Sequence, residues 1–233
     1  DPVLAPNGDE RLYTERLVRL KGCFLPVPVP EWLPESGAAP LEANGHVRFG
    51  SFNNPAKYSQ AVYALWARIL SETPRSVLVF KYRLFGDPGV RQSVTDQMAL
   101  FGIGPDRLGF LGATSRQAHL RAIASIDLVL DSFPYSGATT TLDCLTAGVP
   151  MVTMTGDRNA SRMSASLLTA LGETGFIASD PEEYVSIVAG LIEDPQALKE
   201  TRARVSGALS RSKLCDPSAF VPDLESAFAS MAA

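Results

Sequence analysis

The sequence holds few of the residues that build disulfide frameworks and metal sites. It has three cysteines and two histidines in 233 residues. Cys23, Cys144 and Cys215 are odd in number and far apart, so they predict neither a disulfide framework nor a CxxC metal site. This cysteine usage favours a reducing, cytoplasmic setting. With only His46 and His119 available, we expect no metal held by protein ligands and no cofactor.

Strong charge and long apolar runs are also scarce. The net charge is −4 and the pI is about 5.3, so we expect neither nucleic acid nor an anionic membrane surface as a partner. No apolar run approaches the ~20 residues of a membrane span, and the opening residues do not resemble a signal peptide. The sequence shows no recognisable Ser-His-Asp or Cys-His arrangement, so it does not predict covalent catalysis of that kind.

The first 46 residues differ in composition from the rest of the chain. Seven of the seventeen prolines lie there, and sustained periodicity is limited to a short stretch at 12–20. Such composition is typical of linkers. We therefore interpret residues 1–46 as a linker and the remnant of a preceding domain, and expect the chain to be a fragment.

From residue 47 onward, short apolar runs alternate with helical patterns. The runs predict strands at 47–52, 76–82, 107–112, 127–132, 150–156 and 175–179. The helical patterns predict helices at 58–74, 87–103, 115–126, 139–148, 159–172, 180–193, 195–209 and 216–231. The alternation predicts an α/β fold with a doubly wound, Rossmann-like parallel sheet. We assign residues 47–214 to this domain and 215–233 to a C-terminal helix.

In a doubly wound sheet, ligands bind at the carboxyl ends of the strands. This rule selects three loops with polar residues, at 52–57, 112–119 and 132–140. Each loop has side chains that could bind a nucleotide. Each of these side chains could instead have only a structural role, such as capping a helix or forming a turn.

Lys57 lies at a predicted helix start, where its charge opposes the helix dipole. A bound phosphate would reverse that balance, because the ammonium and the helix would act on the same anion. The alternative is an exposed, solvated lysine. Asn53 and Asn54 either form Asx turns, or Asn54 binds a phosphate or a sugar through its amide.

A second predicted helix start combines Gly137 with Thr139 and Thr140. Glycine permits close approach of the backbone, and each threonine offers an N–H and a hydroxyl to a phosphate oxygen. Ordinary helix capping is the alternative. Asp143 lies on the same helical face, either as a favourable first-turn charge or as an acceptor for ribose hydroxyls.

Arg116 and His119 lie about one turn apart on the helix predicted at 115–126. The imidazole face is suited to stacking on a base, and the guanidinium to reaching a ribose or a phosphate. A structural histidine is the alternative. We interpret the polar cluster at 158–162 mainly as capping and surface, with an active-site lining as the alternative.

Several segments together resemble one known family. They are "FNNPAK", "SVLVFKY", "SRQAHLR", "LDSFPYSGATTTLDCLTAGVPMVTMTG" and "ASRMSASLLTALG". In order and spacing, over residues 47–230, they resemble the catalytic region of O-GlcNAc transferase and its bacterial and plant relatives, glycosyltransferase family 41. These enzymes usually carry tetratricopeptide repeats. "LYTERLVRL" resembles the segment that ends the family's acceptor-side domain.

The resemblance implies roles at the diphosphate end of a donor site. It places Lys57 on the nucleotide diphosphate as the catalytic residue that stabilises the leaving group, with Asn54 nearby. It places Thr139 and Thr140, after Gly137, on the phosphates. Relatives commonly have a glutamine at position 54 and a histidine at position 138, where this chain has asparagine and alanine.

At the nucleoside end, the resemblance places Thr114 against the base through its backbone. Arg116 matches a lysine that contacts the nucleotide, and His119 matches a histidine that stacks on uracil. Asp143 is expected to bind the ribose.

The resemblance therefore implies the C-terminal, donor-binding domain of a GT-B glycosyltransferase. The implied reaction is inverting transfer of a sugar, GlcNAc, from a UDP-sugar to a protein Ser or Thr hydroxyl without a metal. The acceptor-side half and the repeats are not in this sequence, so we expect the chain alone to be inactive. Two alternatives stay open: another GT-B UDP-sugar enzyme, or a degenerate nucleotide-binding interaction module, which Ala138 motivates.

Overall fold

The computed structural model describes residues 1–27, 41 and 45–232, and the side chains of all of these except residues 210 and 232. The predicted proline-rich linker falls partly on residues 28–40 and 42–44, which lie outside the described residues. The division into 1–46, 47–214 and 215–233 therefore stays a prediction.

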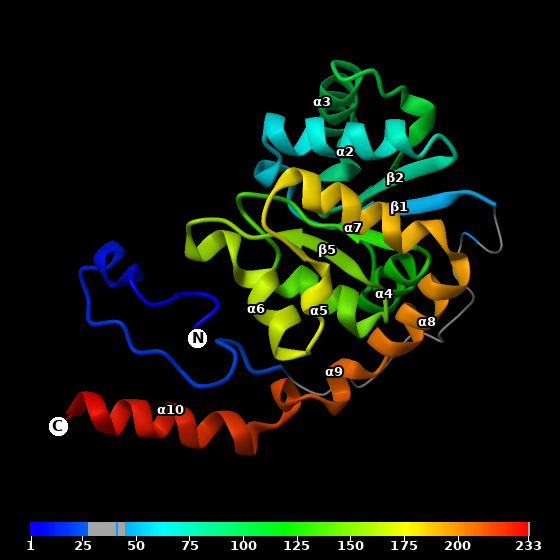
Figure 1. Ribbon diagram of the computed structural model, residues 1–233. Helices are drawn as coiled ribbons and strands as arrows, with labels where there is room; N and C mark the ends of the chain where they lie inside the picture. The colour runs from blue at the N-terminus through cyan, green and yellow to red at the C-terminus, as the bar shows by residue number, and fades with distance from the viewer. Residues whose placement is uncertain (28–40, 42–44, 233) are drawn as a thin grey trace.

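Six parallel strands form one sheet at the centre of the molecule (Figure 1). They are β1 (Val47–Ser51), β2 (Ser76–Lys81), β3 (Leu108–Leu111), β4 (Leu128–Leu130), β5 (Met151–Met154) and β6 (Ile177–Ala178). The strand order is β3-β2-β1-β4-β5-β6, with every neighbouring pair parallel. The predicted doubly wound α/β fold is confirmed. The order reverses between β1 and β4, which is where such sheets bind ligands.

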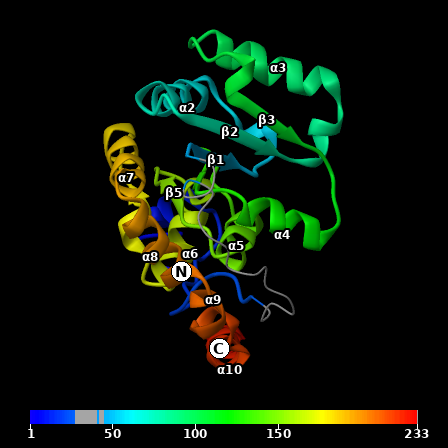
Figure 2. The same ribbon diagram turned by 90° about the vertical axis from the view of Figure 1, so that its right-hand side faces the viewer.

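Helices cover both faces of the sheet (Figures 1 and 2). One face packs against α2 (Gln60–Glu72), α3 (Pro88–Ala99) and α7 (Pro181–Glu193). The other packs against α4 (Arg116–Ala124), α5 (Thr139–Thr146) and α6 (Met163–Ala170). After α7 follow α8 (Pro195–Val205), α9 (Ala208–Arg211) and α10 (Pro217–Ala232). Short 3₁₀ helices are η1 (Asp9–Leu12), η2 (Pro55–Lys57), η3 (Arg83–Gly86), η4 (Pro105–Arg107), η5 (Asn159–Ser161), η6 (Thr174–Phe176) and η7 (Lys213–Cys215).

Short polar side chains begin most of the longer helices. They accept hydrogen bonds from first-turn N–H groups that have no partner within the helix. These caps are Ser59, Asp87, Ser115, Asp180 and Asp194. The helix α5 is different, because Ala138 at its N-cap provides no side-chain hydrogen bond.

The single helix predicted at 195–209 is wrong. The helix α8 ends at Val205, and a separate short helix, α9, begins at Ala208. Between them Gly207 has a φ of 74°, in the left-handed region that favours glycine. The chain therefore turns there, although the apolar periodicity continues across the break.

The N-terminal segment runs beside α6 and the start of α10 (Figure 1). The Asp1 carboxylate accepts the Ser166 hydroxyl at 2.7 Å and the Phe24 N–H at 2.8 Å. Cys23 is buried in the same hydrophobic cluster as Leu214. Residues 1–27 thus contribute to the packing of this side of the domain.

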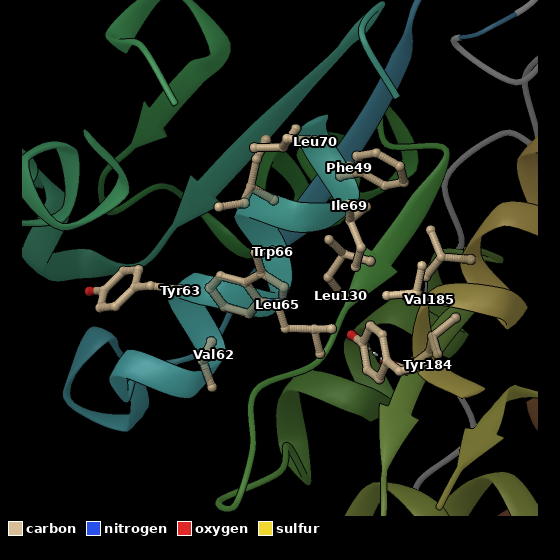
Figure 3. Close-up of a cluster of buried hydrophobic side chains, with 14 of the residues drawn as sticks. Phe49, Val62, Tyr63, Leu65, Trp66, Ile69, Leu70, Leu130, Tyr184 and Val185 are labelled. Carbon is tan, nitrogen blue, oxygen red and sulfur yellow. Dashed lines mark hydrogen bonds between the residues drawn. The ribbon is translucent and has the colours of Figure 1, made fainter. Parts of the chain in front are cut away.

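Aromatic side chains fill the core between α2 and the sheet. Trp66 is fully buried, and Figure 3 shows it on α2 among aliphatic side chains of the same helix. Its ring centroid lies 5.0 Å from that of Tyr58 and 5.8 Å from that of Phe80. Phe80 in turn stacks on Phe110, with centroids 5.5 Å apart. These rings join α2 to β2 and β3.

Replacing Trp66 with alanine tests this packing. Trp66→Ala is expected to lower the free energy of unfolding by about 3–5 kcal/mol, because it leaves a cavity in the core. Phe228→Ala, at a site 59% exposed on α10, is expected to change it by less than about 0.5 kcal/mol. Denaturant unfolding followed by circular dichroism measures both values. Equal losses for the two variants would contradict the assignment of Trp66 to the core.

Candidate functional site

The candidate site lies where the ends of β1 and β4 meet. Asn53 follows β1 and Asp131 follows β4, and the Asn53 side-chain N–H donates to Asp131 Oδ1 at 2.8 Å. The loops after these two strands are therefore joined directly at the point where the strand order reverses.

Asp131 organises the floor of the site. It is 1% exposed, and its Oδ1 also accepts the backbone N–H groups of Ser132 and Gly137, at 3.0 and 3.1 Å. Its Oδ2 accepts the hydroxyls of Thr153 at 2.8 Å and Ser164 at 2.6 Å. The five donor groups come from the loop after β1, the turn after β4, the loop before α5, β5 and α6, so one carboxyl group joins all of these segments.

The protonation of Asp131 reflects two opposing influences. Burial raises the pKa of this carboxyl group, whereas the hydrogen bonds from Ser164, Thr153, Asn53 and Gly137 lower it. Burial has the larger effect, so the pKa lies above its ordinary value.

Lys57 reaches from η2 to the loop after β4. Its Nζ donates to the Ser136 carbonyl at 2.8 Å and to Asn53 Oδ1 at 3.2 Å. It also lies 4.0 Å from the centroid of the Tyr135 ring. Burial lowers the pKa of Lys57, and the nearby Asp131 opposes that shift. The ammonium is thus held by uncharged acceptors at the entrance to α5.

The start of α5 is open to an anion. Gly137 precedes it, and a Cβ at this position would lie 2.7 Å from Thr141 Oγ1, so no larger residue fits without rearrangement. Ala138 provides no cap, while Thr139 is exposed and Thr140 half-buried. First-turn N–H groups without a capping side chain are suited to binding a phosphate.

A second polar cluster joins α4 to α5. Arg116 Nη1 lies 2.5 Å from Asp143 Oδ1, and His119 Nε2 lies 3.0 Å from Asp143 Oδ2. The His119 ring packs edge-on against Phe52, with centroids 6.1 Å apart. Thr114 is exposed in the preceding loop. Asp143 and His119 are largely buried and Arg116 is largely exposed.

The structure therefore groups the predicted residues into two sets. Lys57 approaches the loop that leads to Gly137, Thr139 and Thr140, and Asp143 contacts both Arg116 and His119. Asn54 caps η2, since its Oδ1 accepts the Ala56 N–H at 3.1 Å. What each residue does toward a ligand stays a prediction.

Several residues of the site were not singled out from the sequence. Asp131, Ser136, Tyr135 and Ser164 surround Lys57 or complete the hydrogen-bonding network, and no local pattern reveals which hydroxyl meets which carboxyl group. Asp131 has one available indication, because it directly follows the apolar strand "LVL" at the ligand-binding edge of the sheet.

Among residues 1–27, 41 and 45–232, no group of three or more His, Cys, Asp or Glu side chains has an arrangement that could hold a metal ion. In the same part of the chain, the helices are all too short or too polar to span a bilayer.

Asp131→Asn tests the hydrogen-bonding network. The amide removes one acceptor oxygen from a buried set of donors, so we expect the free energy of unfolding to fall by about 2–3 kcal/mol. Asp157→Asn is the matched control, because the Asp157 side chain is 90% exposed. Thermal and urea unfolding measure both variants. A loss no larger than that of the control would show that Asp131 does not organise the site.

The sequence and the fold were compared with those of known proteins. The sequence profile of Glycosyl transferase family 41 matches residues 41–224. The probable UDP-N-acetylglucosamine–peptide N-acetylglucosaminyltransferase SPINDLY of Petunia hybrida is 38% identical over 233 residues. That match covers 99% of this chain but 25% of the petunia protein, so the chain spans about a quarter of its curated relative.

Solved structures agree with this result. An O-GlcNAc transferase mutant from Thermobaculum terrenum superposes with a TM-score of 0.89 at 34% identity, covering 98% of this chain and 43% of that one. Anabaena HepE, solved in complex with UDP-glucose, superposes with a TM-score of 0.53 at 19% identity, covering 82% of this chain and 50% of that one, and shares the fold alone. The chain has the nucleotide-domain fold of GT-B glycosyltransferases, and it belongs to glycosyltransferase family 41, the family of O-GlcNAc transferase and SPINDLY.

Proposed function

We propose that this chain binds a nucleotide sugar, a UDP-sugar, and forms the donor side of an inverting glycosyltransferase. The observation that carries the proposal is that the Lys57 ammonium lies close to the N-terminus of α5, which has a partial positive charge. The Lys57 ammonium is bonded to the carbonyl of Ser136, two residues before the uncapped N-cap of α5. A diphosphate bound there receives both the lysine charge and the free N–H groups of the helix.

This arrangement suits departure of a nucleoside diphosphate. Negative charge develops on the leaving diphosphate as the sugar bond breaks, and preorganised donors stabilise that charge most in the transition state. Lys57 and the N–H groups of Thr139 and Thr140 supply donors of this kind, and Asn54 caps η2, the short helix that ends at Lys57. Protein groups then provide the electrostatic stabilisation that metal ions give in other transferases.

The second polar cluster is suited to the nucleoside. Asp143 is a carboxylate on the first turns of α5, and ribose hydroxyls are ligands that such a group accepts. His119 presents a largely buried imidazole for stacking, and Arg116, on the same helix, contacts the same carboxylate. Thr114 lies two residues before the start of this helix.

The remaining parts of the reaction are proposed by analogy with the relatives. The petunia relative is named for transfer from UDP-N-acetylglucosamine to peptides, so we propose GlcNAc as the sugar and Ser or Thr of a cytoplasmic protein as the acceptor. This chain spans a quarter of that relative. We therefore propose that an acceptor-side half and tetratricopeptide repeats belong to the same polypeptide, and that the chain alone transfers no sugar.

One observation favours a second candidate. Ala138 has only a methyl side chain at the start of α5, so it offers no hydrogen bond to a donor bound there. The alternative function is a non-catalytic module that binds nucleotide and mediates an interaction. A transfer assay with radiolabelled UDP-GlcNAc and the complete polypeptide separates the two, because only the first candidate labels an acceptor protein.

Titration calorimetry with UDP, in the presence of EDTA, tests the donor site. Lys57→Met is expected to weaken UDP binding by about 1.5–3 kcal/mol, as for loss of a charge-assisted hydrogen bond. Lys57→Arg should retain most of the affinity. Lys213→Met, at an exposed lysine in η7, is the control and should bind like the wild type. Unchanged binding by Lys57→Met would remove the central support for the proposal.

The pH dependence of binding tests the charge state of Lys57. Burial lowers the pKa of Lys57, and only the protonated ammonium attracts a diphosphate. UDP affinity of the wild type is therefore expected to fall as pH rises through that lowered pKa, before an ordinary lysine would deprotonate. Lys57→Arg stays protonated over this range, so the difference between the two titration curves isolates Lys57. Parallel curves would show that the Lys57 charge does not contribute.

A further inference from the structure

A second lysine, Lys81, is buried and has no charged partner in the described part of the chain. Lys81 is the last residue of β2 and is 4% exposed. Its Nζ donates to the Gly112 carbonyl at 3.1 Å. Among the residues that the structure describes, no carboxylate lies within ion-pair distance of it. An ammonium has three donors, so the described part of the protein leaves two of them unused in a buried position.

The sheet places this ammonium at its ligand-binding edge. Lys81 pairs with Leu111 at the end of β3, and Phe80 pairs with Ser51 at the end of β1. Side chains alternate along a strand, so Lys81 lies on the same face as Val79. Val79 belongs to the hydrophobic cluster that includes Phe52, whose ring contacts His119. Lys81 therefore lies on the α4 side of the sheet, the side that also carries the second polar cluster.

The geometry also indicates which part of a nucleotide comes closest. The proposed diphosphate lies at Lys57 and the start of α5, where β1 and β4 end. Asp143 on α5 contacts His119 on α4, so a nucleoside bound at both residues extends from α5 toward α4. The loop before α4 begins at Gly112, whose carbonyl already holds Lys81. The base, at the far end of the nucleotide from the diphosphate, thus meets this loop.

We propose that Lys81 contacts the base of the bound nucleotide and selects a base edge that presents a carbonyl oxygen. An ammonium only donates hydrogen bonds, so it donates to a carbonyl oxygen and disfavours an amino group. Uracil and guanine present carbonyl oxygens, whereas adenine presents an amino group. The inference rests on the proposed function and adds a specificity-determining residue to it.

A purely structural role of Lys81 would give a different result from a contact with the base. Burial lowers the pKa of Lys81, as expected for an ammonium without a counter-charge. If Lys81 only joined β2 to the loop after β3, its replacement would change stability and weaken all ligands in parallel. If Lys81 contacts the base, its replacement changes the order of the nucleotide affinities and leaves the phosphate contacts intact.

The test compares four ligands with the 233-residue chain by calorimetry: UDP, GDP, ADP and inorganic pyrophosphate. The wild type is expected to bind UDP or GDP about tenfold or more tightly than ADP, as for one discriminating charged hydrogen bond. Lys81→Met should remove this preference and leave pyrophosphate affinity within about twofold. Lys81→Gln should bind ADP better relative to the preferred nucleotide, because an amide can also accept from an amino group.

Two controls separate the possible failures. Thermal unfolding of each variant reports folding, and Lys81→Gln decides the question if Lys81→Met does not fold. Lys57→Met is expected to weaken all four ligands. If it does so while both Lys81 variants keep the wild-type ranking, or lose all four ligands equally, the role of Lys81 is overturned and the donor site stands. If the wild type binds none of the four ligands, the proposed function fails and the inference fails with it.

Discussion

The buried carboxyl group of Asp131 is the contact on which the site depends. Five donors converge on its two oxygens, from the loop after β1, the turn after β4, β5 and α6. A carboxyl group removed from water is stable only when such donors replace its hydration. The donors need the carboxyl group in turn, because without its two oxygens these groups would have lost a hydrogen-bond acceptor. The position of Asn53, and through it of Lys57, is therefore set by a group that need not touch the ligand.

The two ends of the proposed nucleotide site differ in their electrostatics. At one end a cation, Lys57, directly contacts a carbonyl, an amide oxygen and an aromatic ring, and Asp131 acts on it only from beyond these contacts. At the other end an anion, Asp143, is held by Arg116 and His119. A ligand with a diphosphate at one end and hydroxyl groups toward the other matches this polarity.

Pattern and periodicity predicted the strands, most of the helices and the ligand-binding edge, because these follow from local alternation of apolar and polar residues. They failed at Gly207, where backbone conformation ends a helix that side-chain periodicity would continue. Lys57 was predicted at a helix start, where its charge is unfavourable, but in the structure it ends η2, and α2 begins at Gln60. Asp131 was not singled out, because its importance arises from partners far away in sequence, such as Asn53 and Ser164. Local sequence predicts where a site lies better than it predicts what holds the site rigid.

The spread of the Asp131 partners along the chain has a consequence for biosynthesis. Asn53 is made early and Ser164 more than a hundred residues later, and the pairing of β1 with β4 joins segments separated by two complete strand–helix units. Contacts of such long sequence separation form late, because the loop between them must close first. A nascent chain that has not yet exposed Ser164 outside the ribosome therefore has β1, β2 and β3 available for pairing but no finished nucleotide site. Assembly of the site therefore requires the chain through α6, whereas β6 and α7 are made after it.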